Sequence, residues 1–199
     1  DISKHVVNAL VATEDERFYD HKGIDPRSLG RALFFLGSEG GASTITMQTA
    51  KNLFTDNWGT KNKLLRVIQK IKESIIAIKL ERNFTKQEII TLYLNTVPFS
   101  ENLFGVSNAS RTFFQKEPDR LNVQESAILI GMLKGTTLYN PRRNPKLALV
   151  RRNTVLSQMV RNNYLLETEA DKLKLNPIEL NFKKMDEYAG LGPYFRMIL

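Results

Sequence analysis

The sequence predicts a mostly α domain, and three patterns along its 199 residues lead to that prediction. Apolar residues recur at helical spacing in most segments, whereas alternation with the period of a β-strand is scarce. Capping boxes precede two apolar segments, "TKQE" at 85–88 and "NVQE" at 122–125. In two others an N-cap residue is followed by proline, at 25–26 and at 144–145. The length allows one sizeable core, so we expect a single domain with at most two lobes.

The expected helices follow in chain order from these patterns. The spacing of Val6, Val7, Leu10 and Val11 predicts a helix over 3–18. Further helices are expected to begin near residues 26, 44, 60, 86, 123, 145 and 168, with loops at 37–42, 54–60 and 96–104. The tail changes character after residue 180. We therefore assign residues 1–180 to the domain and 181–199 to a linker.

Composition narrows the classes of partner. Lys and Arg total 29 against 21 Asp and Glu, so the net charge of +8 favours an anionic partner: nucleic acid, phosphate groups or an anionic membrane surface. With no cysteine and two histidines, the chain has neither a disulfide framework nor an evident metal site. No apolar run approaches the roughly 20 residues that cross a bilayer.

Glu14 is the first acidic residue that the helical pattern singles out. It continues the stripe of Val7, Leu10 and Val11, so its carboxylate is expected on a face that is otherwise buried. Burial favours the protonated form of a carboxylate, which suits proton transfer near neutral pH. The alternative interpretation is a helix-end glutamate that bends out to solvent.

Glu73 is the second acidic candidate, on the helix expected over 60–82. It shares one flank of that helix with Arg66 and Lys70. It lies off the strongest apolar stripe of the sequence, formed by Leu64, Ile68, Ile71, Ile75 and Ile78. A solvated face with weak ion pairs is the ordinary interpretation of that position. Two acidic groups in a basic protein suggest glycosyl chemistry, where one carboxylate moves a proton and another orients a partner.

The segment "GSEGGASTITMQTAKNL" combines a glycine-rich run with a hydroxyl-rich helix. Ser43 is the expected N-cap, and Thr44, Gln48 and Lys51 form a polar stripe behind it. On another side, Met47, Ala50 and Phe54 are expected to pack inward. A glycine-rich loop that enters a helix N-terminus leaves backbone N–H groups free to bind an anion. The alternative is a flexible loop followed by an amphipathic surface helix. The lysine and preceding strand of a phosphate-loop NTPase are missing.

Three basic residues complete the candidates. Arg151 and Arg152 are adjacent, so their side chains point about 100° apart on a helix and at most one faces inward comfortably. A basic helix surface is the ordinary interpretation of the pair. His21 lies at a turn, where it could simply bond to the backbone.

The motifs occur in the order "EDERFYDHKGID", "GGASTITMQTAKN", "KIKE", "KQEIITLYLN" and "RRNTVL". Together they resemble the peptidoglycan glycosyltransferase domain, glycosyltransferase family 51, of class A penicillin-binding proteins and monofunctional transglycosylases. The resemblance implies a lysozyme-like fold with a larger head lobe and a smaller, membrane-facing jaw lobe. The tail resembles the segment that leads into a transpeptidase domain. The implied location is the outer face of the bacterial cytoplasmic membrane, with an anchor outside this sequence.

The resemblance also implies the reaction. Members of the family transfer a growing glycan chain, linked to a lipid pyrophosphate, to the 4-hydroxyl of lipid II with inversion, and undecaprenyl pyrophosphate leaves. Glu14 would be the general base and Glu73 the second carboxylate, on the pyrophosphate or acceptor side. The residues that would bind substrate or supply positive charge are Asp15, Phe18, His21, Ser43, Thr44, Gln48, Lys51, Asn52, Lys70, Lys72, Arg151 and Arg152. No cofactor is required, although Mg²⁺ or Mn²⁺ stimulates many relatives.

Two positions depart from the family pattern. The second motif usually reads Gln-Gln where this chain has Met47-Gln48, and the third usually begins Arg-Lys where it has Gln69-Lys70. A cation is thus missing beside the expected pyrophosphate site. Arg66 lies one turn earlier on the flank of Lys70 and is our candidate to replace it. We expect Arg66→Ala to lower turnover by more than its effect on stability explains, and unchanged turnover of the folded variant would reject the idea.

Two other classes of function stay open at this point. A lysozyme-like lytic enzyme would position a water instead of a sugar hydroxyl, and a basic helical module without activity would bind nucleic acid with steep salt dependence. Family members also insert an apolar patch into the bilayer. The candidates for that patch are Leu33, Phe34, Phe35 and Leu36, with Phe99, Leu103 and Phe104 as a second group.

Overall fold

The computed structural model describes residues 1–28, 43–54, 63–100 and 103–184. Over these ranges the chain is helical, and the one β-type pairing is an isolated bridge between Pro98 and Phe104. The elements are α1 (Lys4–Glu14), α3 (Ile45–Phe54), α4 (Lys63–Asn83), α5 (Lys86–Thr96), α6 (Val106–Phe114), the 3-10 turn η1 (Pro118–Arg120), α7 (Val123–Met132), α8 (Pro145–Arg161) and α9 (Glu167–Leu175).

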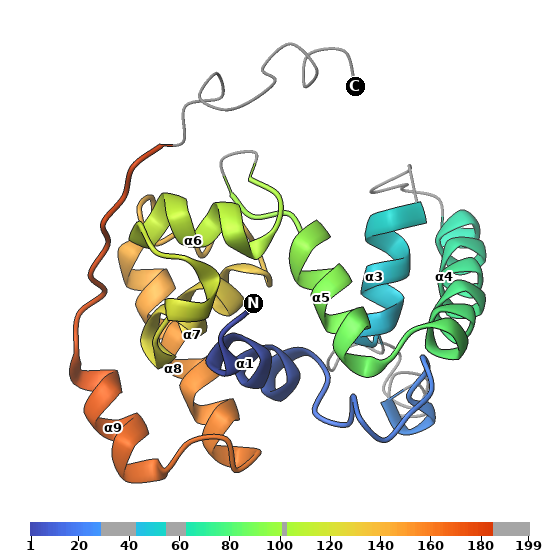
Figure 1. Ribbon diagram of the computed structural model, residues 1–199, viewed down its shortest axis with the longest axis horizontal. Coiled ribbons are helices and arrows are strands. Elements are labelled where there is room, and N and C mark those ends of the chain that lie inside the picture. Colours follow the sequence, from blue (N-terminus) through green and yellow to red (C-terminus); the bar gives the residue numbers. More distant parts are fainter. Residues whose placement is uncertain (29–42, 55–62, 101–102, 185–199) are drawn as a thin grey trace.

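The helices form two lobes (Figure 1). In the larger lobe α1 packs against α7 and α8, which are flanked by α6 and α9. In the smaller lobe α3 packs against both α4 and α5. Contacts between α5 and α6 join the two lobes along the chain. The prediction of a mostly α domain with a larger and a smaller lobe is therefore confirmed.

Helix α7 is the centre of the larger lobe. Every residue from 126 to 132 is buried, so the helix is enclosed on all sides. Its neighbour α1 contributes Val6 and Leu10, which are both fully buried, and α8 contributes Val155 and Leu156. Each such side chain contributes about 1.5–3 kcal/mol through burial of apolar surface. This packing holds the end of α1, and with it Glu14, in a fixed place.

Local signals in the sequence set most helix starts. Both capping boxes form: Thr85 caps α5 with Glu88, and Asn122 caps α7 with Glu125. The Asp25 carboxylate accepts a hydrogen bond from the backbone N–H of Arg27 at 3.0 Å, as an N-cap does. Asn144 precedes Pro145 at the start of α8, although its side chain makes no capping bond there.

Other expected boundaries were wrong. The first helix ends at Glu14, not at residue 18, because the chain turns there and the side chain of Asp15 bonds elsewhere. Thr44, not Ser43, caps α3, since its hydroxyl accepts the N–H of Met47 at 3.1 Å. The last helix begins one residue before Thr168. The loop predicted at 37–42 lies outside the described residues.

The orientation of α4 is opposite to what its apolar stripe suggests. Ile68, Ile71 and Ile75 are exposed, with 42%, 55% and 51% of their surface accessible. The buried face is instead formed by Glu73, Ala77 and Leu80, of which Glu73 is 7% exposed. The solvated position predicted for Glu73 is therefore wrong. In the part of the chain that the structure describes, no helix combines the length and apolar character needed to cross a membrane.

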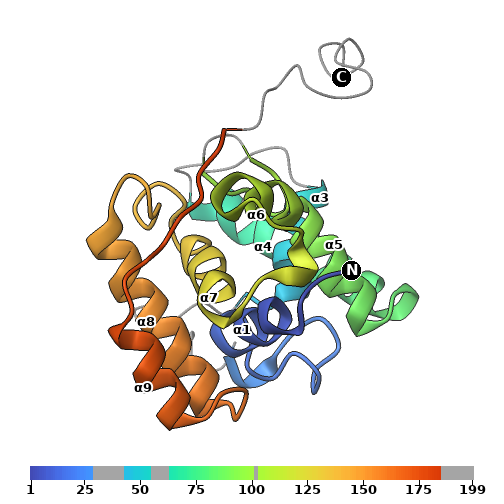
Figure 2. The same cartoon turned by 60° about the vertical axis from the view of Figure 1, so that its left-hand side comes forward.

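After α9 the chain runs back over the larger lobe in extended form (Figure 2). The N–H groups of Asn181 and Lys183 donate to the carbonyls of Phe113 and Thr112 in α6. The ring of Phe182 packs edge-on against Phe113, with centroids 5.5 Å apart. The chain thus packs on the domain through residue 183, slightly past the predicted boundary at 180. The remainder of the predicted linker, residues 185–199, lies outside the described residues.

At Gly23 the backbone of the loop after α1 packs closely against α4 of the smaller lobe. The φ of Gly23 is +92°, and a Cβ at this position would lie 2.9 Å from the backbone of Ala77 in α4. We expect Gly23→Ala to lower the free energy of unfolding by about 2–4 kcal/mol, because it adds backbone strain and a clash with main-chain atoms. Urea unfolding measures this. Gly135→Ala is the matched control, since its Cβ meets nothing closer than 3.6 Å. Equal losses in both variants would contradict the prediction.

Candidate active site

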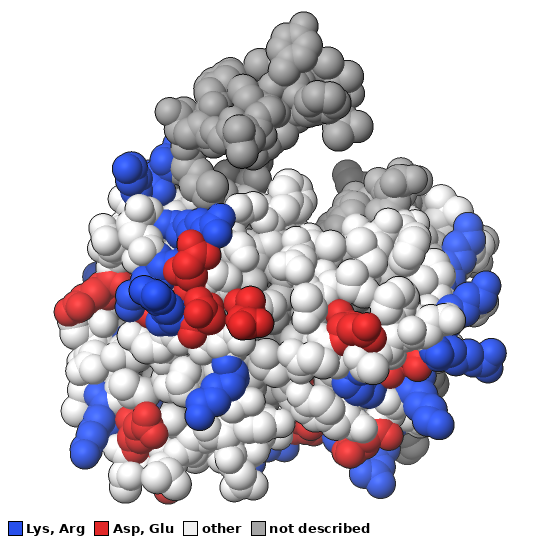
Figure 3. Space-filling model, viewed as in Figure 1, with Lys and Arg blue, Asp and Glu red and all other residues white. Residues whose placement is uncertain are grey.

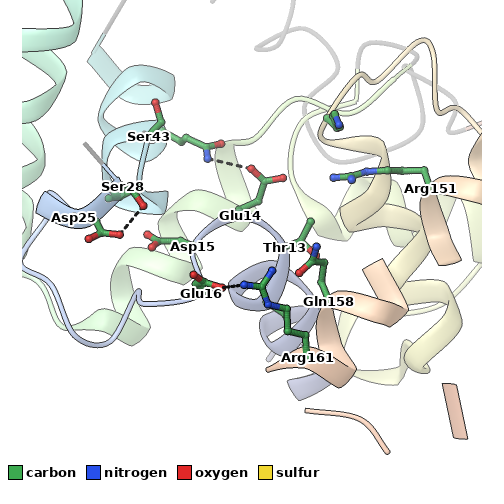
Figure 4. Close-up of a pocket in the computed structure, with 14 residues that line it drawn as sticks. Thr13, Glu14, Asp15, Glu16, Asp25, Ser28, Ser43, Arg151, Gln158 and Arg161 are labelled. Carbon is green, nitrogen blue, oxygen red and sulfur yellow. Dashed lines mark hydrogen bonds and ion pairs between the residues drawn. The ribbon is translucent and has the colours of Figure 1, made fainter. Parts of the chain in front are cut away.

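A cleft of about 540 Å³ lies between the lobes (Figure 4). Its walls are the end of α1 with the loop that follows, the start of α3, and one face of α8 with the residues just after α7. Six of the residues predicted from the sequence line it: Glu14, Asp15, Ser43, Thr44, Gln48 and Arg151. Eight other residues complete its lining: Ala12, Thr13, Glu16, Asp25, Ser28, Lys134, Gln158 and Arg161.

Glu14 is the last residue of α1 and is half-buried in the cleft wall. Figure 4 shows its carboxylate between the start of α3 on one side and Arg151 on the other. The side-chain amide of Gln48 donates from Nε2 to Oε2 of Glu14 at 3.3 Å. The hydroxyl of Tyr93 in turn donates to Oε1 of Gln48 at 3.1 Å. Both lobes thus contribute to the position of this carboxylate, since Gln48 and Tyr93 belong to the smaller one.

Asp15 ties the loop after α1 to the start of α3. Its carboxylate accepts the backbone N–H of Ile45 at 2.9 Å and contacts Nε2 of His21 at 3.0 Å, with both side chains buried. The N–H of Met47 is already taken by the hydroxyl of Thr44. The expectation that this helix start offers free N–H groups to an anion is therefore wrong for these two groups. Ser43 and Gln48 are among the residues of this segment that line the cleft.

Lys70 and Glu73 approach the cleft from α4. The ammonium group of Lys70 donates to the hydroxyl of Ser43, and it lies 3.5 Å from the carboxylate of Glu73. Burial lowers the pKa of Lys70, the nearby Lys51 lowers it further, and Glu73 opposes both effects. Glu73 is thus not in the cleft wall. Its carboxylate holds a cation beside Ser43, at the edge of the cleft.

The carboxylates along the cleft differ in their partners. Asp25 is bonded to Arg17, whose guanidinium lies 2.5 Å from Oδ2. Burial alone would raise the pKa of Asp25, but hydrogen bonds from Arg17, Ser28 and the N–H of Arg27 outweigh it and hold the pKa well below its usual value. Glu16 is also paired with Arg17, at 2.9 Å. Within the described residues, Glu14 is bonded to a neutral amide and to no cation.

A polar cluster behind the cleft was not predicted from the sequence. Lys86 donates to the carbonyl of His21 at 2.6 Å and to the carboxylate of Glu81 at 2.8 Å, and it lies 4.3 Å from the ring centroid of Phe18. Glu81 also accepts the hydroxyl of Thr46 at 2.6 Å. The cluster therefore fixes the loop that carries Asp15 to α3 and α4. No periodic pattern marks it, because its members come from four separate segments.

The larger lobe contributes a basic wall. Arg151 donates to the carbonyl of Gly131 at 3.3 Å, and its side chain lines the cleft. Lys134, Gln158 and Arg161 join it there, and all three were missed in the sequence analysis. Two of them could have been predicted from their helical spacing in the sequence. Gln158 and Arg161 follow Arg151 by seven and ten residues and so share its face of α8.

Arg152 does not reach the cleft, contrary to the prediction. Its side chain is fully buried on a different side of α8 from Arg151. It donates to the side chains of Gln124 and Asn153 and to the backbone carbonyls of Lys174 and Pro177. Burial lowers the pKa of this guanidinium. Arg152 is therefore a structural residue that joins α7, α8 and the end of α9.

The other predicted residues lie around the cleft but not in its wall. Phe18 is fully buried and His21 nearly so, with their rings packed edge-on. Lys51 and Asn52 are half-buried on α3, and the Nδ2 of Asn52 has no hydrogen-bond partner among the described residues. Arg66 and Lys72 are exposed on α4. The proposal that Arg66 replaces the missing cation therefore stays a prediction.

The described residues offer no resident metal site. Across residues 1–28, 43–54, 63–100 and 103–184, no three His, Asp or Glu side chains lie close enough together to hold an ion. Stimulation by Mg²⁺ or Mn²⁺ stays a prediction.

The two lobes and the cleft between them, with Glu14 at its wall, match what the sequence resemblance implied. The chain belongs to the transglycosylase family, whose sequence model matches residues 1–160. This membership confirms the resemblance and the lysozyme-like class of the fold.

The relatives of the chain include penicillin-binding proteins 1A from several bacteria. The chain is 40% identical to that of Aquifex aeolicus over 201 residues, which cover 99% of this chain and 27% of the relative. It is 38% identical to that of Haemophilus influenzae, over 92% of this chain and 21% of the relative. For Escherichia coli the identity is 37%, over 97% and 22%. The chain thus spans about a quarter of the length of these relatives.

Proposed function

We propose that this domain polymerises the glycan strands of peptidoglycan from lipid II. The growing strand, linked to lipid pyrophosphate, is the donor, and the 4-hydroxyl of a new lipid II is the acceptor. The observation that carries the proposal is the set of hydrogen-bond partners of Glu14. Glu14 is the cleft carboxylate that, among the described residues, is bonded to a neutral amide, whereas Asp15, Glu16 and Asp25 are each bonded to a basic side chain. The Glu14 carboxylate is therefore not held in an ion pair within the described residues, and it lines the cleft where an acceptor hydroxyl would approach.

The proposed mechanism uses Glu14 as the general base. Its carboxylate accepts the proton of the acceptor 4-hydroxyl as that oxygen attacks the anomeric carbon of the donor, and the bond from that carbon to the pyrophosphate oxygen breaks with inversion. General bases of this kind contribute about 10²- to 10⁴-fold to the rate. The role of Gln48 is to hold the carboxylate through its bond to Oε2.

The basic residues around the cleft suit the negative charge of the leaving group. A pyrophosphate departs as a weakly basic anion, so it needs nearby cations more than it needs a proton. Lys70, held by Glu73 and bonded to Ser43, supplies one cation at the edge of the cleft nearest α4. Arg151, Lys134 and Arg161 supply others along the opposite wall. In this proposal Glu73 acts through Lys70 rather than on the sugar.

A lytic enzyme is less well supported by this cleft. Hydrolysis of a glycosidic bond uses two carboxylates, one as acid and one as base or nucleophile. Among the other carboxylates, Asp25 is held ionised and so is not an acid, its Oδ2 is occupied by Arg17, and Asp15 is buried in bonds to His21 and Ile45. A nucleic-acid module is also poorly supported. On the face shown in Figure 3, basic and acidic side chains are interspersed over the larger lobe, and the row of basic side chains is confined to the edge where α4 lies.

We also propose that the exposed stripe of α4 faces the membrane that carries lipid II, which would place the domain on the outer face of the bacterial cytoplasmic membrane. Lys and Arg side chains project along the edge of the molecule where α4 lies (Figure 3). Exposed basic residues of α4 include Arg66, Lys72 and Lys79, close to the apolar stripe. Apolar side chains flanked by cations suit an anionic lipid surface.

This assignment differs from the patches named in the sequence analysis. Leu33, Phe34, Phe35 and Leu36 lie outside the described residues. Of the second group, Phe99 is 4% exposed and belongs to the core, and Leu103 is partly buried against it. Phe104 alone of that group is strongly exposed, at 59%.

Val67→Ser with Ile71→Ser tests the membrane face. Both side chains are more than half exposed, so their loss should leave the fold intact while partitioning into vesicles of phosphatidylglycerol and phosphatidylethanolamine falls at least about tenfold. Sedimentation with vesicles measures this. Leu166→Ser with Leu175→Ser is the control, because these leucines are 72% and 87% exposed on the larger lobe. Equal losses in the two pairs would reject α4 as the contact.

Product analysis tests the proposed reaction. The chain is incubated with fluorescently labelled lipid II in detergent, and in parallel with preformed glycan strands. We expect polymer from lipid II and intact strands in the second reaction. Cleaved strands would favour the lytic alternative. If labelled lipid II neither binds nor reacts while DNA or RNA binds with steep salt dependence, the binding module replaces the transferase.

A further inference from the structure

Tyr93 lies directly behind the candidate base, outside the cleft. Its side chain is 1% exposed in the middle of α5, and its hydroxyl donates to Oε1 of Gln48 at 3.1 Å. The other end of the same amide donates to Glu14 at 3.3 Å. A continuous chain of hydrogen bonds therefore runs from a buried phenol to the carboxylate. The sequence analysis singled out Gln48 and Glu14 but not Tyr93.

The direction of every bond in this chain follows from chemistry. An ionised carboxylate can only accept, so the NH₂ end of the Gln48 amide must face Glu14. The carbonyl end of the amide then faces Tyr93 and needs a donor there. A phenol supplies one only while it is protonated. Burial raises the pKa of Tyr93 well above its ordinary value, and the negative charge of Glu14 raises it further, so the hydroxyl keeps its proton.

We propose that Tyr93 is a positioning residue for glycosyl transfer, whose hydroxyl holds the carbonyl end of the Gln48 amide while the NH₂ end bonds to Glu14. The inference rests on the proposed role of Glu14 as base. With the amide fixed, Oε2 of Glu14 is held by Gln48, and Oε1 has no hydrogen-bond partner among the described residues. That oxygen is then free to accept the proton of the acceptor hydroxyl. Tyr93 itself contacts no substrate, because it is buried behind Gln48.

Without the hydroxyl, the carbonyl end of the amide loses its donor, and the amide is held at one end only, by Glu14. The Gln48 side chain can then turn away from Glu14, and the carboxylate loses the bond that holds it in position. Part of the population would carry a misplaced base. Substrate binding depends on other side chains of the cleft, so the loss should fall on turnover.

The experiment uses Tyr93→Phe, which removes only the hydroxyl. We expect kcat for lipid II polymerisation to fall about tenfold with KM changed less than twofold. Thr96→Val is the matched control on the same helix: its hydroxyl bonds to the backbone carbonyls of Leu92 and Tyr93 and touches neither Gln48 nor Glu14. It should leave both constants unchanged. Incorporation of 4-aminophenylalanine at position 93 restores a donor and should recover most of the lost kcat.

A spectroscopic readout is independent of activity. The side-chain NH₂ resonances of Gln48, assigned by their loss in Gln48→Leu, should shift and exchange faster in Tyr93→Phe than in the wild type or in Thr96→Val. Should Tyr93→Phe fail to fold, Gln48→Glu is the second variant, since it keeps an acceptor for Tyr93 but removes the donor to Glu14. It should lower kcat at least as much as the first variant was expected to.

Several outcomes would overturn the inference. One is an unchanged kcat in folded Tyr93→Phe or Gln48→Glu, including the case in which only KM rises. Another is unchanged Gln48 amide resonances in Tyr93→Phe. A further one is a tenfold loss on adding Tyr93→Phe to Gln48→Leu, since Tyr93 would then act without the amide. A wild-type chain that makes no polymer would instead reject the proposed function, and the resonances would still report on the amide.

Discussion

Glu14→Gln is expected to lower the rate of glycan polymerisation by about 10²- to 10⁴-fold, the range typical for loss of a general base. The substitution keeps the size of the side chain but removes the group that accepts the proton. Gln48 would then face an amide in place of a carboxylate, and the fold should remain intact because Glu14 is half-buried at a helix end. Polymerisation of labelled lipid II in detergent measures the effect, with circular dichroism as the check on folding.

Binding of lipid II distinguishes a chemical role from a binding role for Glu14. We expect the variant to bind lipid II with an affinity within a few-fold of the wild type. Glu167→Gln is the control, because Glu167 is exposed at the start of α9 and does not line the cleft, so its loss should change neither rate nor binding. A folded Glu14→Gln that polymerises at more than a tenth of the wild-type rate would remove Glu14 as the base.

The parts of the fold that were predictable are those specified by local signals. The capping boxes at Thr85 and Asn122 form because each satisfies backbone groups within four residues of its own position. The inward position of Met47 and Ala50, which are 3% and 0% exposed, follows from the helical period. Phe54 has the same period but is 58% exposed, because it ends α3 where no neighbouring helix in the described residues covers it.

The orientation of α4 could not be predicted from its own residues. Periodicity identifies an apolar face, and the usual assumption is that such a face is buried. Here the face with Glu73, Ala77 and Leu80 packs inward, because Glu73 has Lys70 as a partner and Ala77 allows the close approach of Gly23. In our proposal the isoleucines contact the membrane. They are then removed from water without being packed in the interior of the protein. The sequence gives no sign of which environment an apolar stripe meets.

The candidate site likewise contains residues that could be predicted from the sequence and residues that could not. Glu14, Gln48 and Arg151 were found from helical spacing and the family motifs, and the structure brings them to one cleft. Lys86 and Glu81 were missed because their partners, Thr46 and the carbonyl of His21, are distant in sequence. Such bonds between separate segments are determined only when the lobes are assembled.

Substitutions at Arg151 and Arg152 are expected to produce the second large effect, which differs between stability and activity. We expect Arg152→Ala to lower the free energy of unfolding by about 2–5 kcal/mol, because it opens a cavity and leaves buried carbonyls without donors. Arg152 is fully buried and bonded to Gln124, Asn153 and the carbonyls of Lys174 and Pro177. Arg151→Ala should change stability by less than about 1 kcal/mol, since its side chain is partly exposed at the cleft.

The effects on activity should be reversed between the two arginines. Arg151→Ala removes a cation from the wall that we assign to the pyrophosphate, and kcat/KM should fall about 10- to 100-fold, as for loss of a charged contact of about 1.5–3 kcal/mol. Arg152→Met, which keeps most of the buried volume, should retain most of the activity at a temperature where it is folded. Urea unfolding and lipid II polymerisation measure both quantities on the same samples. If Arg152→Met is stable but inactive while Arg151→Ala is fully active, then the charge that serves the reaction comes from Arg152, and the assignment of the cleft to this face of α8 is wrong.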